Sequence, residues 1–195
     1  MSTSLKANIE NKLDRAIENN EFEKLSKLMF EKSFDKKGFL AEEGVVCNHI
    51  YFIEQGSCYS YLIEPEGEKQ VVQLAIEGNW ISDLFSFFSG QKAIYTVESL
   101  EPVKVLVMNR ENFEKACDII PWFDRFFRVL IQNAYIASIY QLARTNSEEV
   151  EARYKELSKS HPQLIQRIPQ YLIASYLGVK PQSLSRIRKE SAHKI

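Results

Sequence analysis

Cysteine and histidine are scarce in this sequence, and their scarcity excludes several classes of protein. The chain of 195 residues has three of each, and the cysteines are widely spaced, at Cys47, Cys58 and Cys117. Three distant cysteines fit neither a disulfide framework nor a zinc site, and an iron–sulfur cluster needs about four cysteine ligands. We therefore expect free thiols in a reducing compartment.

The histidines form no metal-binding or catalytic pattern, because they stand in unrelated contexts, at His49, His161 and His193. No glycine-rich phosphate loop precedes a helix, and no paired carboxylates stand out. The sequence thus predicts a protein that is not an enzyme and that holds no metal or cofactor.

Long apolar runs are also missing. No stretch approaches the roughly 20 residues that a membrane span requires, and the N-terminal residues lack the apolar core of a signal peptide. With 45% apolar and 26% charged residues, the composition is that of a globular protein. We expect a cytoplasmic protein without a membrane partner, built as one large or two small domains.

The net charge is close to zero, but it is unevenly distributed. The whole chain carries −1, whereas residues 163–195 hold six basic side chains against Glu190 alone, a net +5. The remaining residues therefore carry −6. A basic end on an acidic body is typical of a nucleic-acid-binding protein that approaches DNA only with that end.

The first half of the chain changes from helical to strand-like patterning. Apolar side chains at helical spacing predict one or two short helices between Ile9 and Lys32. From Ser33 to Asn109, short runs rich in Val, Ile, Tyr and Phe are punctuated by glycine, which predicts a small antiparallel barrel or sandwich. One helical insert is expected within it, at Trp80–Phe88. Asn109 is the expected cap of a helix that follows, over Arg110–Cys117.

The stretch Gln170–Lys189 predicts two short helices joined by a tight turn. Gly178 tolerates the positive φ that such a turn needs, and Pro181 suits the first turn of a second helix. Apolar or small residues in register flank the turn, at Ile173, Ala174, Leu177, Val179, Leu184 and Ile187. This pattern favours a helix-turn-helix. An ordinary helical hairpin with a solvated basic face is the alternative.

The second of these helices carries side chains that can donate to bases and phosphates of a major groove. They are Lys180, Gln182, Ser183, Ser185, Arg186, Arg188 and Lys189. We expect Arg186 to read a base, with Gln182 and Ser183 beside it. Arg188 and Lys189 are expected to bind phosphates.

Two segments carry a family resemblance. Gly44, the run Ile50–Ile53 and Gly56 resemble the double-stranded β-roll of cyclic nucleotide-binding domains. Residues 78–84, Gly-Asn-Trp-Ile-Ser-Asp-Leu, resemble that family's Gly-Asp-Phe-(Ile/Phe)-Gly-Glu-Leu segment. With the helix-turn-helix after them, the chain resembles the Crp/Fnr superfamily of bacterial transcription regulators from about Phe34 to Lys189. The resemblance implies an α+β fold: a β-roll (double-stranded jelly roll) with flanking helices, a long dimerisation helix and an all-α helix-turn-helix domain.

The sequence departs from this family where cyclic nucleotides bind. In the responsive members, the segment's Glu binds the ribose and a later Arg-Ser pair binds the cyclic phosphate. Here Asp83 stands for the Glu, and Ala93 and Ile94 stand for the Arg-Ser pair, with Lys92 beside them. Lysine lacks the bidentate fork of arginine, so control by cyclic AMP is not expected. The roll is then a ligand-free scaffold or a site for another molecule, in a pocket formed by Trp80, Ser82, Asp83, Lys92, Ala93 and Ile94.

Residues from about 121 to 144 fit the family's dimerisation helix, which packs on its twin as a coiled coil. Part of its apolar stripe must belong to the core, and the expected dimer contacts are Phe123, Phe127, Leu130, Ala134 and Ala137. Thr145–Ser147 is expected to break this helix and start the next, through a capping box of Thr145 with Glu148 or Asn146 with Glu149. The expected domains are therefore a sensor at 1–144 and a helix-turn-helix domain at 145–195.

These features predict a homodimeric bacterial transcription regulator that reads a palindromic site in double-stranded DNA. RNA polymerase is a further candidate partner, and a small-molecule effector is either unknown or absent. The alternative is a ligand-binding signalling module that acts through protein contacts, with a degenerate helix-turn-helix. A cupin-like metal enzyme ranks third, because histidines at metal-ligand spacing are missing from the strands. The +5 end favours the DNA binder.

Overall fold

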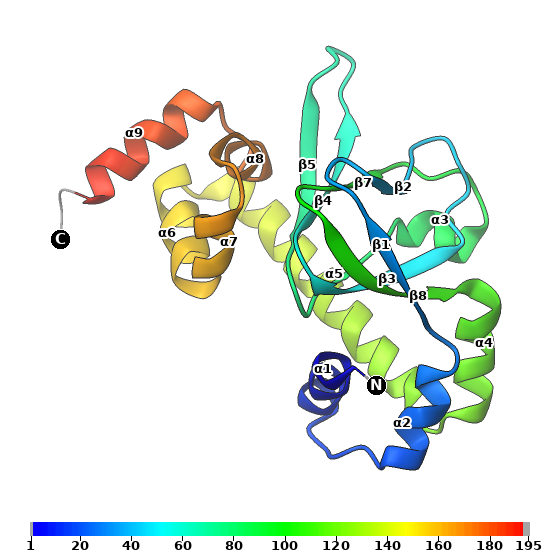
Figure 1. Cartoon of the computed structure of the whole chain (residues 1–195). Helices are drawn as coiled ribbons and strands as arrows, with labels where there is room; N and C mark the ends of the chain where they lie inside the picture. The colour runs from blue at the N-terminus through cyan, green and yellow to red at the C-terminus, as the bar shows by residue number, and fades with distance from the viewer. Residues whose placement is uncertain (1, 193–195) are drawn as a thin grey trace.

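The computed structural model describes residues 2–192, apart from the side chains of residues 145–147, 191 and 192. Figure 1 shows a β-roll with helices beneath it, a long helix, α5, that runs from these helices past the roll, and a small helical unit at the far end of α5. No helix of the described chain combines the length and the apolar character needed to cross a membrane.

The roll consists of two antiparallel sheets, ordered β1-β8-β3-β6 and β2-β7-β4-β5. The first sheet holds β1 (Phe30–Phe34), β3 (His49–Gln55), β6 (Trp80–Ile81) and β8 (Val103–Asn109). The second holds β2 (Phe39–Ala41), β4 (Cys58–Ile63), β5 (Lys69–Ala75) and β7 (Thr96–Ser99). Small apolar side chains such as Val97 and Val105 fill the space between the sheets. The jelly-roll-like arrangement expected from the sequence is confirmed.

The tight connection between β3 and β4 requires glycine. Gly56 has φ +96°, and a Cβ added there would lie 2.6 Å from the side chain of Val103. Both the positive φ and the close approach disfavour every other residue.

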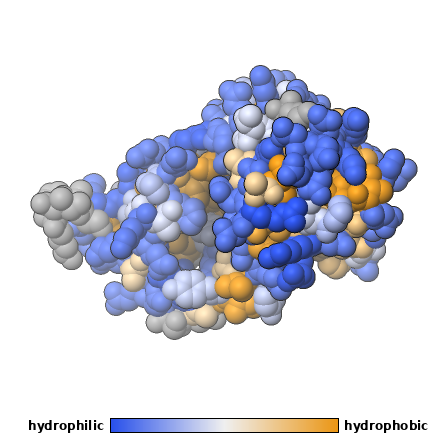
Figure 2. Space-filling view, turned by 90° about the horizontal axis from the view of Figure 1, so that it is seen from below, coloured by the Kyte–Doolittle hydropathy of each residue, from blue (hydrophilic) through white to orange (hydrophobic). Residues whose placement is uncertain are grey.

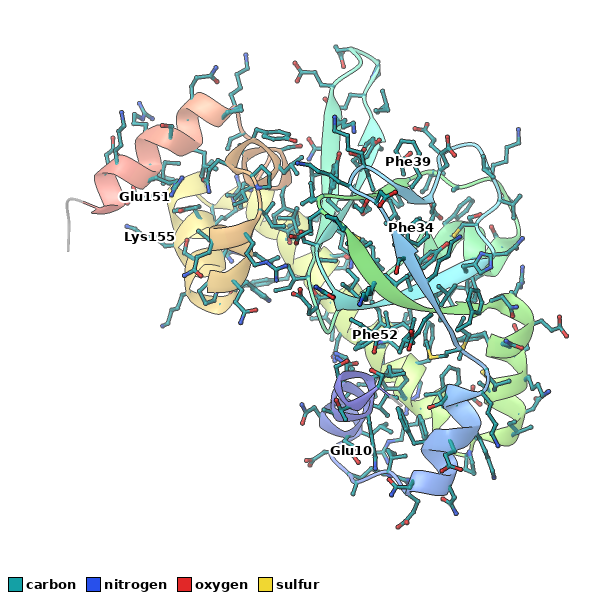
Figure 3. All side chains as sticks on the ribbon, in the orientation of Figure 1. Glu10, Phe34, Phe39, Phe52, Glu151 and Lys155 are labelled. Atoms are coloured by element: carbon teal, nitrogen blue, oxygen red, sulfur yellow. The ribbon has the colours of Figure 1, made fainter. Side chains whose placement is uncertain are left out.

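The N-terminal helices cover the outer face of the first sheet. They are α1 (Thr3–Leu13) and α2 (Asn19–Ser26), and the apolar residues predicted to form their inner face are all buried, from Ile9 through Met29. They share one core with α4, α5 and the outer side chains of β3, including Phe52, which Figure 3 shows between the roll and the helices. The short helices predicted for this segment are therefore present, and they pack against the roll.

The helix expected at Trp80–Phe88 is partly wrong. Trp80 and Ile81 form β6 and pair with Phe52 and Tyr51 of β3, and only then does α3 (Leu84–Ser89) begin. Local spacing could not indicate this, because the pairing partner lies far back in the chain. The helix ends at Ser89, one residue beyond the predicted end, and is capped by Gly90, which has φ 72°.

Two helices connect the roll to the C-terminal unit. Asn109 caps α4 (Arg110–Ile119) as predicted, because its Oδ1 accepts the N–H of Asn112 at 2.8 Å. Next, α5 (Phe123–Ser147) is 25 residues long and continues through the expected break. The next helix, α6 (Val150–Ser160), follows Glu149 without a side-chain cap, so the predicted start of a helix at Thr145 or Asn146 is wrong. The side chains of those two residues lie outside the described part.

Arg144, near the end of α5, forms ion pairs with two acidic side chains that follow this helix. The Arg144 guanidinium bonds Glu148 just beyond the end of α5, with Nε at 2.7 Å from Oε2, and it also pairs with Glu156 of α6. The rest of the C-terminal unit is α7 (Pro162–Arg167), α8 (Gln170–Tyr176) and α9 (Pro181–Ala192).

Candidate nucleic-acid interface and effector pocket

A glycine turn sets the angle between α8 and α9. Gly178 has φ +69°, a left-handed conformation that glycine adopts without steric cost. Its N–H donates to Ser175 O at 2.9 Å, and the N–H of Val179 donates to Ala174 O at 2.9 Å. These bonds close the end of α8 in the manner of a C-terminal cap and turn the chain into α9. Ala174 is fully buried, as expected of a small residue at a helix crossing.

The predicted apolar register forms the core of this helical unit. Five of its six members are buried, at Ile173, Ala174, Leu177, Leu184 and Ile187, and Val179 is partly buried against them. The role of Arg153 on α6 was not predicted: this residue is 8% exposed and donates from Nη1 to Leu177 O at 2.9 Å. Arginine in a helix is usually a surface residue, so only the fold reveals that this one supports the turn.

The outer face of α9 is polar and exposed. Every residue predicted to contact DNA lies on it or at its start: Lys180, Gln182, Ser183, Ser185, Arg186, Arg188 and Lys189. Arg186 has a 78% exposed side chain and lies 3.9 Å from Glu190. Such a contact is worth about 0–1 kcal/mol, so it holds the guanidinium only weakly.

Arg167, which belongs to the basic C-terminal block, points elsewhere. Its guanidinium pairs with Glu77 and donates from Nη2 to Glu101 Oε1 at 2.8 Å, and both carboxylates belong to turns of the roll. Glu77 is also bonded to the β3–β4 turn, because its Oε1 accepts the N–H of Gly56 at 2.7 Å. Arg167 therefore contributes to the position of the helical unit and not to the face of α9.

Helix α8 is bonded to β5, the edge strand of the second sheet. The Ser175 hydroxyl accepts the N–H of Val71 at 2.9 Å and donates to Lys69 O at 2.9 Å. The Gln70 amide donates to Ser175 O at 2.9 Å. These bonds satisfy the exposed edge of the strand and leave α9 pointing away from the roll (Figure 1).

Asp83 cannot act as the predicted effector ligand. It is 0% exposed. Oδ1 accepts the N–H of Ser86 at 2.7 Å, and Oδ2 accepts the N–H groups of Ile94 and Tyr95 at 2.8 Å. The carboxylate thus caps α3 and fixes the following loop, which leaves no oxygen free for a ribose hydroxyl.

The other predicted pocket residues separate into two groups. Trp80 and Ser82 border a cavity, whereas Lys92, Ala93 and Ile94 do not. Lys92 and Ile94 are exposed on the surface. Ala93 is buried, and its backbone forms hydrogen bonds with the backbone of Gly44 and Val45. Among the described residues that border this cavity there is no Arg or Lys.

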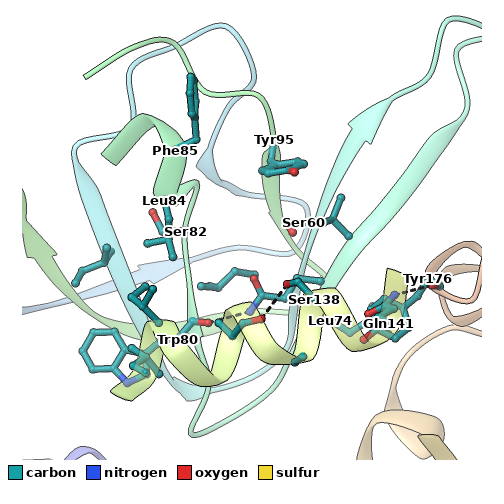
Figure 4. A pocket seen from close by; sticks show the side chains of 18 of the residues that line it. Ser60, Leu74, Trp80, Ser82, Leu84, Phe85, Tyr95, Ser138, Gln141 and Tyr176 are labelled. Atoms are coloured by element: carbon teal, nitrogen blue, oxygen red, sulfur yellow. Dashed lines mark hydrogen bonds between the residues drawn. The ribbon is translucent and has the colours of Figure 1, made fainter. Parts of the chain in front are cut away.

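The cavity lies between the roll and α5, with a volume of about 380 Å³. Figure 4 shows Trp80 and Ser138 on the α5 side, Phe85 and Tyr95 above them, and Tyr176 of α8 at one end. Its remaining walls come from β4, β5 and the inner face of α5, which supplies Leu130, Ala134 and Ala137. The sequence missed this arrangement, because Tyr176 is far from the roll along the chain.

The predicted dimer contacts on α5 lie on the side of the helix that faces the roll, although Ala134 and Ala137 are themselves exposed. Phe123 and Phe127 are 0% and 5% exposed and belong to the core, and Leu130, Ala134 and Ala137 border the cavity. The opposite face is apolar and uncovered, with Ile136 63% and Ile139 49% exposed. The view from below shows such apolar patches interrupting a largely hydrophilic surface (Figure 2).

The cysteines take no part in either site. All three are free thiols, and burial, with Glu101 nearby, raises the pKa of the Cys58 thiol to about 12. A thiol with such a pKa remains protonated and unreactive. Among the residues that the structure describes, no three His, Cys, Asp or Glu side chains gather as a metal site would require.

Comparisons with known proteins agree with this geometry. Residues 31–119 match the cyclic nucleotide-binding domain family. The chain resembles FixK2 from Bradyrhizobium japonicum, with a TM-score of 0.72, 16% identity and 85% of each chain covered. It also resembles the c-di-GMP-responsive regulator CLP of Xanthomonas campestris, with a TM-score of 0.71, 11% identity and coverage of 91% of this chain and 93% of that one.

A mutant of CooA from Carboxydothermus hydrogenoformans is similar over 100% of this chain and 86% of its own, with a TM-score of 0.70 and 14% identity. No curated protein sequence matches this one. At these identities the structural likeness shows the fold. Residues 31–119 therefore match the cyclic nucleotide-binding domain family, and the chain has the fold of FixK2, CLP and CooA.

Proposed function

We propose that this protein is a homodimeric DNA-binding transcription regulator that does not respond to cyclic AMP. The observation that carries the proposal is the exposed polar face of α9, presented outward by the α8–α9 turn. Two helices joined in this way form a helix-turn-helix, in which the second helix enters the major groove and its first residues contact base edges. Gln182, Ser183 and Arg186 occupy those positions on α9.

Dimerisation would use the outer face of α5. Val129, Gln132, Ile136, Ile139 and Ala143 follow one another at alternating intervals of three and four residues, which is the seam of a two-stranded coiled coil. This seam lies opposite the residues that border the cavity. We therefore propose this seam as the dimer interface, in place of the contacts predicted from the sequence at Leu130, Ala134 and Ala137, which border the cavity. The α5–α6 joint at residues 148–149 then separates the sensor from the DNA-binding unit.

Independence from cyclic AMP is supported by the charges around the cavity. A cyclic phosphate carries a full negative charge, and burying it without a partner costs several kcal/mol. No charged side chain is among the described residues that border the cavity, and Asp83 is occupied by three backbone N–H groups. Calorimetry should therefore detect no micromolar binding of cyclic AMP, and cyclic AMP should not alter DNA affinity.

A charge-matched comparison tests the DNA-binding part. A variant with Arg186, Arg188 and Lys189 changed to Ala should lose most of its affinity for duplex DNA in a fluorescence anisotropy titration. Its affinity should also depend less on salt, because each lost phosphate contact lowers the slope by about 0.9. The control changes three exposed lysines on the other side of the molecule, Lys24, Lys36 and Lys115, and should bind as the unmodified protein does. Equal losses in both variants would show attraction by overall charge alone and would refute the proposed interface.

A further inference from the structure

The cavity between the roll and α5 contains hydroxyl groups that no protein group satisfies. Ser60 borders it and is only 3% exposed. Within residues 2–192, no hydrogen bond reaches the Ser60 hydroxyl or that of Tyr95. Both residues lie on the roll side of the cavity (Figure 4). Neither hydroxyl is among the fully buried side-chain atoms without a partner, so each is open to the cavity and can bond to a ligand group there.

The rest of the cavity wall is mainly aromatic and aliphatic, and its other polar residues are Gln73, Ser82, Ser138 and Gln141. Trp80, Phe85, Phe127 and Tyr176 supply rings, and Trp80 is held by Phe52 and Phe127, with ring centroids 5.3 and 6.5 Å away. Burial raises the pKa of the Tyr176 phenol, so that side chain stays neutral. The described lining residues include no Asp, Glu, Lys, Arg or His.

We propose that this cavity binds a small, uncharged aromatic molecule whose one or two polar groups bond to Ser60 and Tyr95. Its volume of about 380 Å³ lies in the range of roughly 300–1,000 Å³ that is usual for ligand pockets. Aromatic rings favour stacked or edge-on contact with another ring, and a charged ligand would find no counter-charge. Because Tyr176 belongs to α8, the bound molecule contacts the roll, α5 and the DNA-binding unit together.

Two nearly identical probes separate an uncharged ligand from a charged one. N-phenyl-1-naphthylamine is a neutral aromatic amine with one N–H, and 1-anilinonaphthalene-8-sulfonate adds a single negative charge to the same framework. Both fluoresce more strongly in apolar sites, so each can be titrated against the full-length protein without DNA. The neutral probe should bind once per protomer, about tenfold or more tightly than the sulfonate. Sulfonate binding as tight as that of the neutral probe would overturn the proposed ligand class.

Variants locate the site. Ala137→Phe puts a ring into the open cavity and should weaken the neutral probe about tenfold or more, whereas Asn133→Phe adds the same ring to an exposed position of α5 and should leave binding unchanged. Ser60→Ala should weaken it about fivefold through the lost hydrogen bond. Unchanged binding to Ala137→Phe would place the probe outside the cavity and refute the site. DNA affinity plays no part in these measurements, so their failure would leave the proposed function standing.

Discussion

At the scale of single residues, we propose two roles for the basic side chains of α9, base reading and phosphate binding. Arg186 lies on the exposed face about one turn after Pro181, where a recognition helix contacts base edges. Arg186→Ala should cost about 1–3 kcal/mol on the preferred sequence and relax the preference at one base pair. Arg188→Ala should instead weaken all sequences alike and lower the salt slope by about 0.9.

Anisotropy titrations on a preferred and a scrambled duplex at several salt concentrations distinguish the two roles. If Arg186→Ala weakened both duplexes equally, its assignment as a base reader would be wrong. These α9 residues could be predicted from the sequence, because their helical spacing places them together on one face of the proposed recognition helix. The charge count of residues 163–195 also included Arg167, and only the fold reveals that this arginine pairs with the roll.

Asp83 has a structural role that its position in the family motif concealed. Its carboxylate satisfies three N–H groups, on Ser86, Ile94 and Tyr95. Because Asp83→Ala leaves buried donors unpaired, we expect a loss of about 2–4 kcal/mol in unfolding free energy. Urea denaturation measures it, and the exposed Asp118→Ala should stay within about 0.5 kcal/mol of the unmodified protein. An Asp83→Ala variant of normal stability would contradict the structural role.

At the scale of elements, the contact between α7 and the roll depends on the charge of Glu77. Partial burial alone would raise the pKa of this carboxyl, but hydrogen bonds from Arg167 and Gly56 hold it below its ordinary value of 4.5. A lowered pKa in the folded state stabilises the fold above the unfolded pKa, and this contribution is lost as the pH falls through the folded value. The ion pairs are about one-third exposed, so we expect at most about 1 kcal/mol.

The backbone amide of Val71 reports this contact, because its N–H donates to Ser175 of α8. At pH 7, Arg167→Ala should increase hydrogen exchange at Val71 by up to about fivefold relative to the unmodified protein. The ratio should approach one as the pH falls below about 4.5. Lys159→Ala removes an exposed cation from the same unit and should leave the exchange unchanged. A ratio that persists at low pH would exclude the ion pair as the cause.

The faces of α5 illustrate what local patterning can and cannot predict. The sequence correctly indicated a long helix with more apolar surface than one neighbour could cover. It could not indicate which stripe faces the roll, because both stripes are apolar and their assignment depends on contacts with distant β-strands. The same limit explains β6, whose pairing with β3 replaced the expected helix. It also explains why the predicted break at Thr145 is absent. Arg144 of α5 pairs with Glu148 and Glu156, which lie after the predicted break, and local spacing could not indicate those pairs.

The uncovered stripe of α5 predicts the effect of a single charge. Ile136→Glu should give a monomer in sedimentation velocity at micromolar concentration, because a buried unpaired charge is unfavourable at a coiled-coil seam. Tyr135→Glu is the control, because Tyr135 is equally exposed, at 66% against 63%, but lies about 100° round the helix. A dimer that survives Ile136→Glu but not Tyr135→Glu would move the interface to another face.

At the scale of the whole molecule, the roll, the long helix and the C-terminal helix pair meet through contacts that no local pattern contains. Ser175 bonds to Val71 across 104 residues of sequence, and Tyr176 borders a cavity made by the roll and α5. The order of the parts was predictable, because each has its own periodicity. Their docking was not, since it depends on single polar side chains at the surface of each part.

The central claim is that two copies of the chain read one DNA site with their α9 helices. Selection of bound duplexes from a random pool by the purified protein tests it most directly. The account predicts enrichment of an inverted repeat whose half-sites lie about 10 base pairs, or about 34 Å, apart, and loss of the paired half-sites when Ile136→Glu is used instead. A single asymmetric motif, or no enrichment by the unmodified protein, would contradict it.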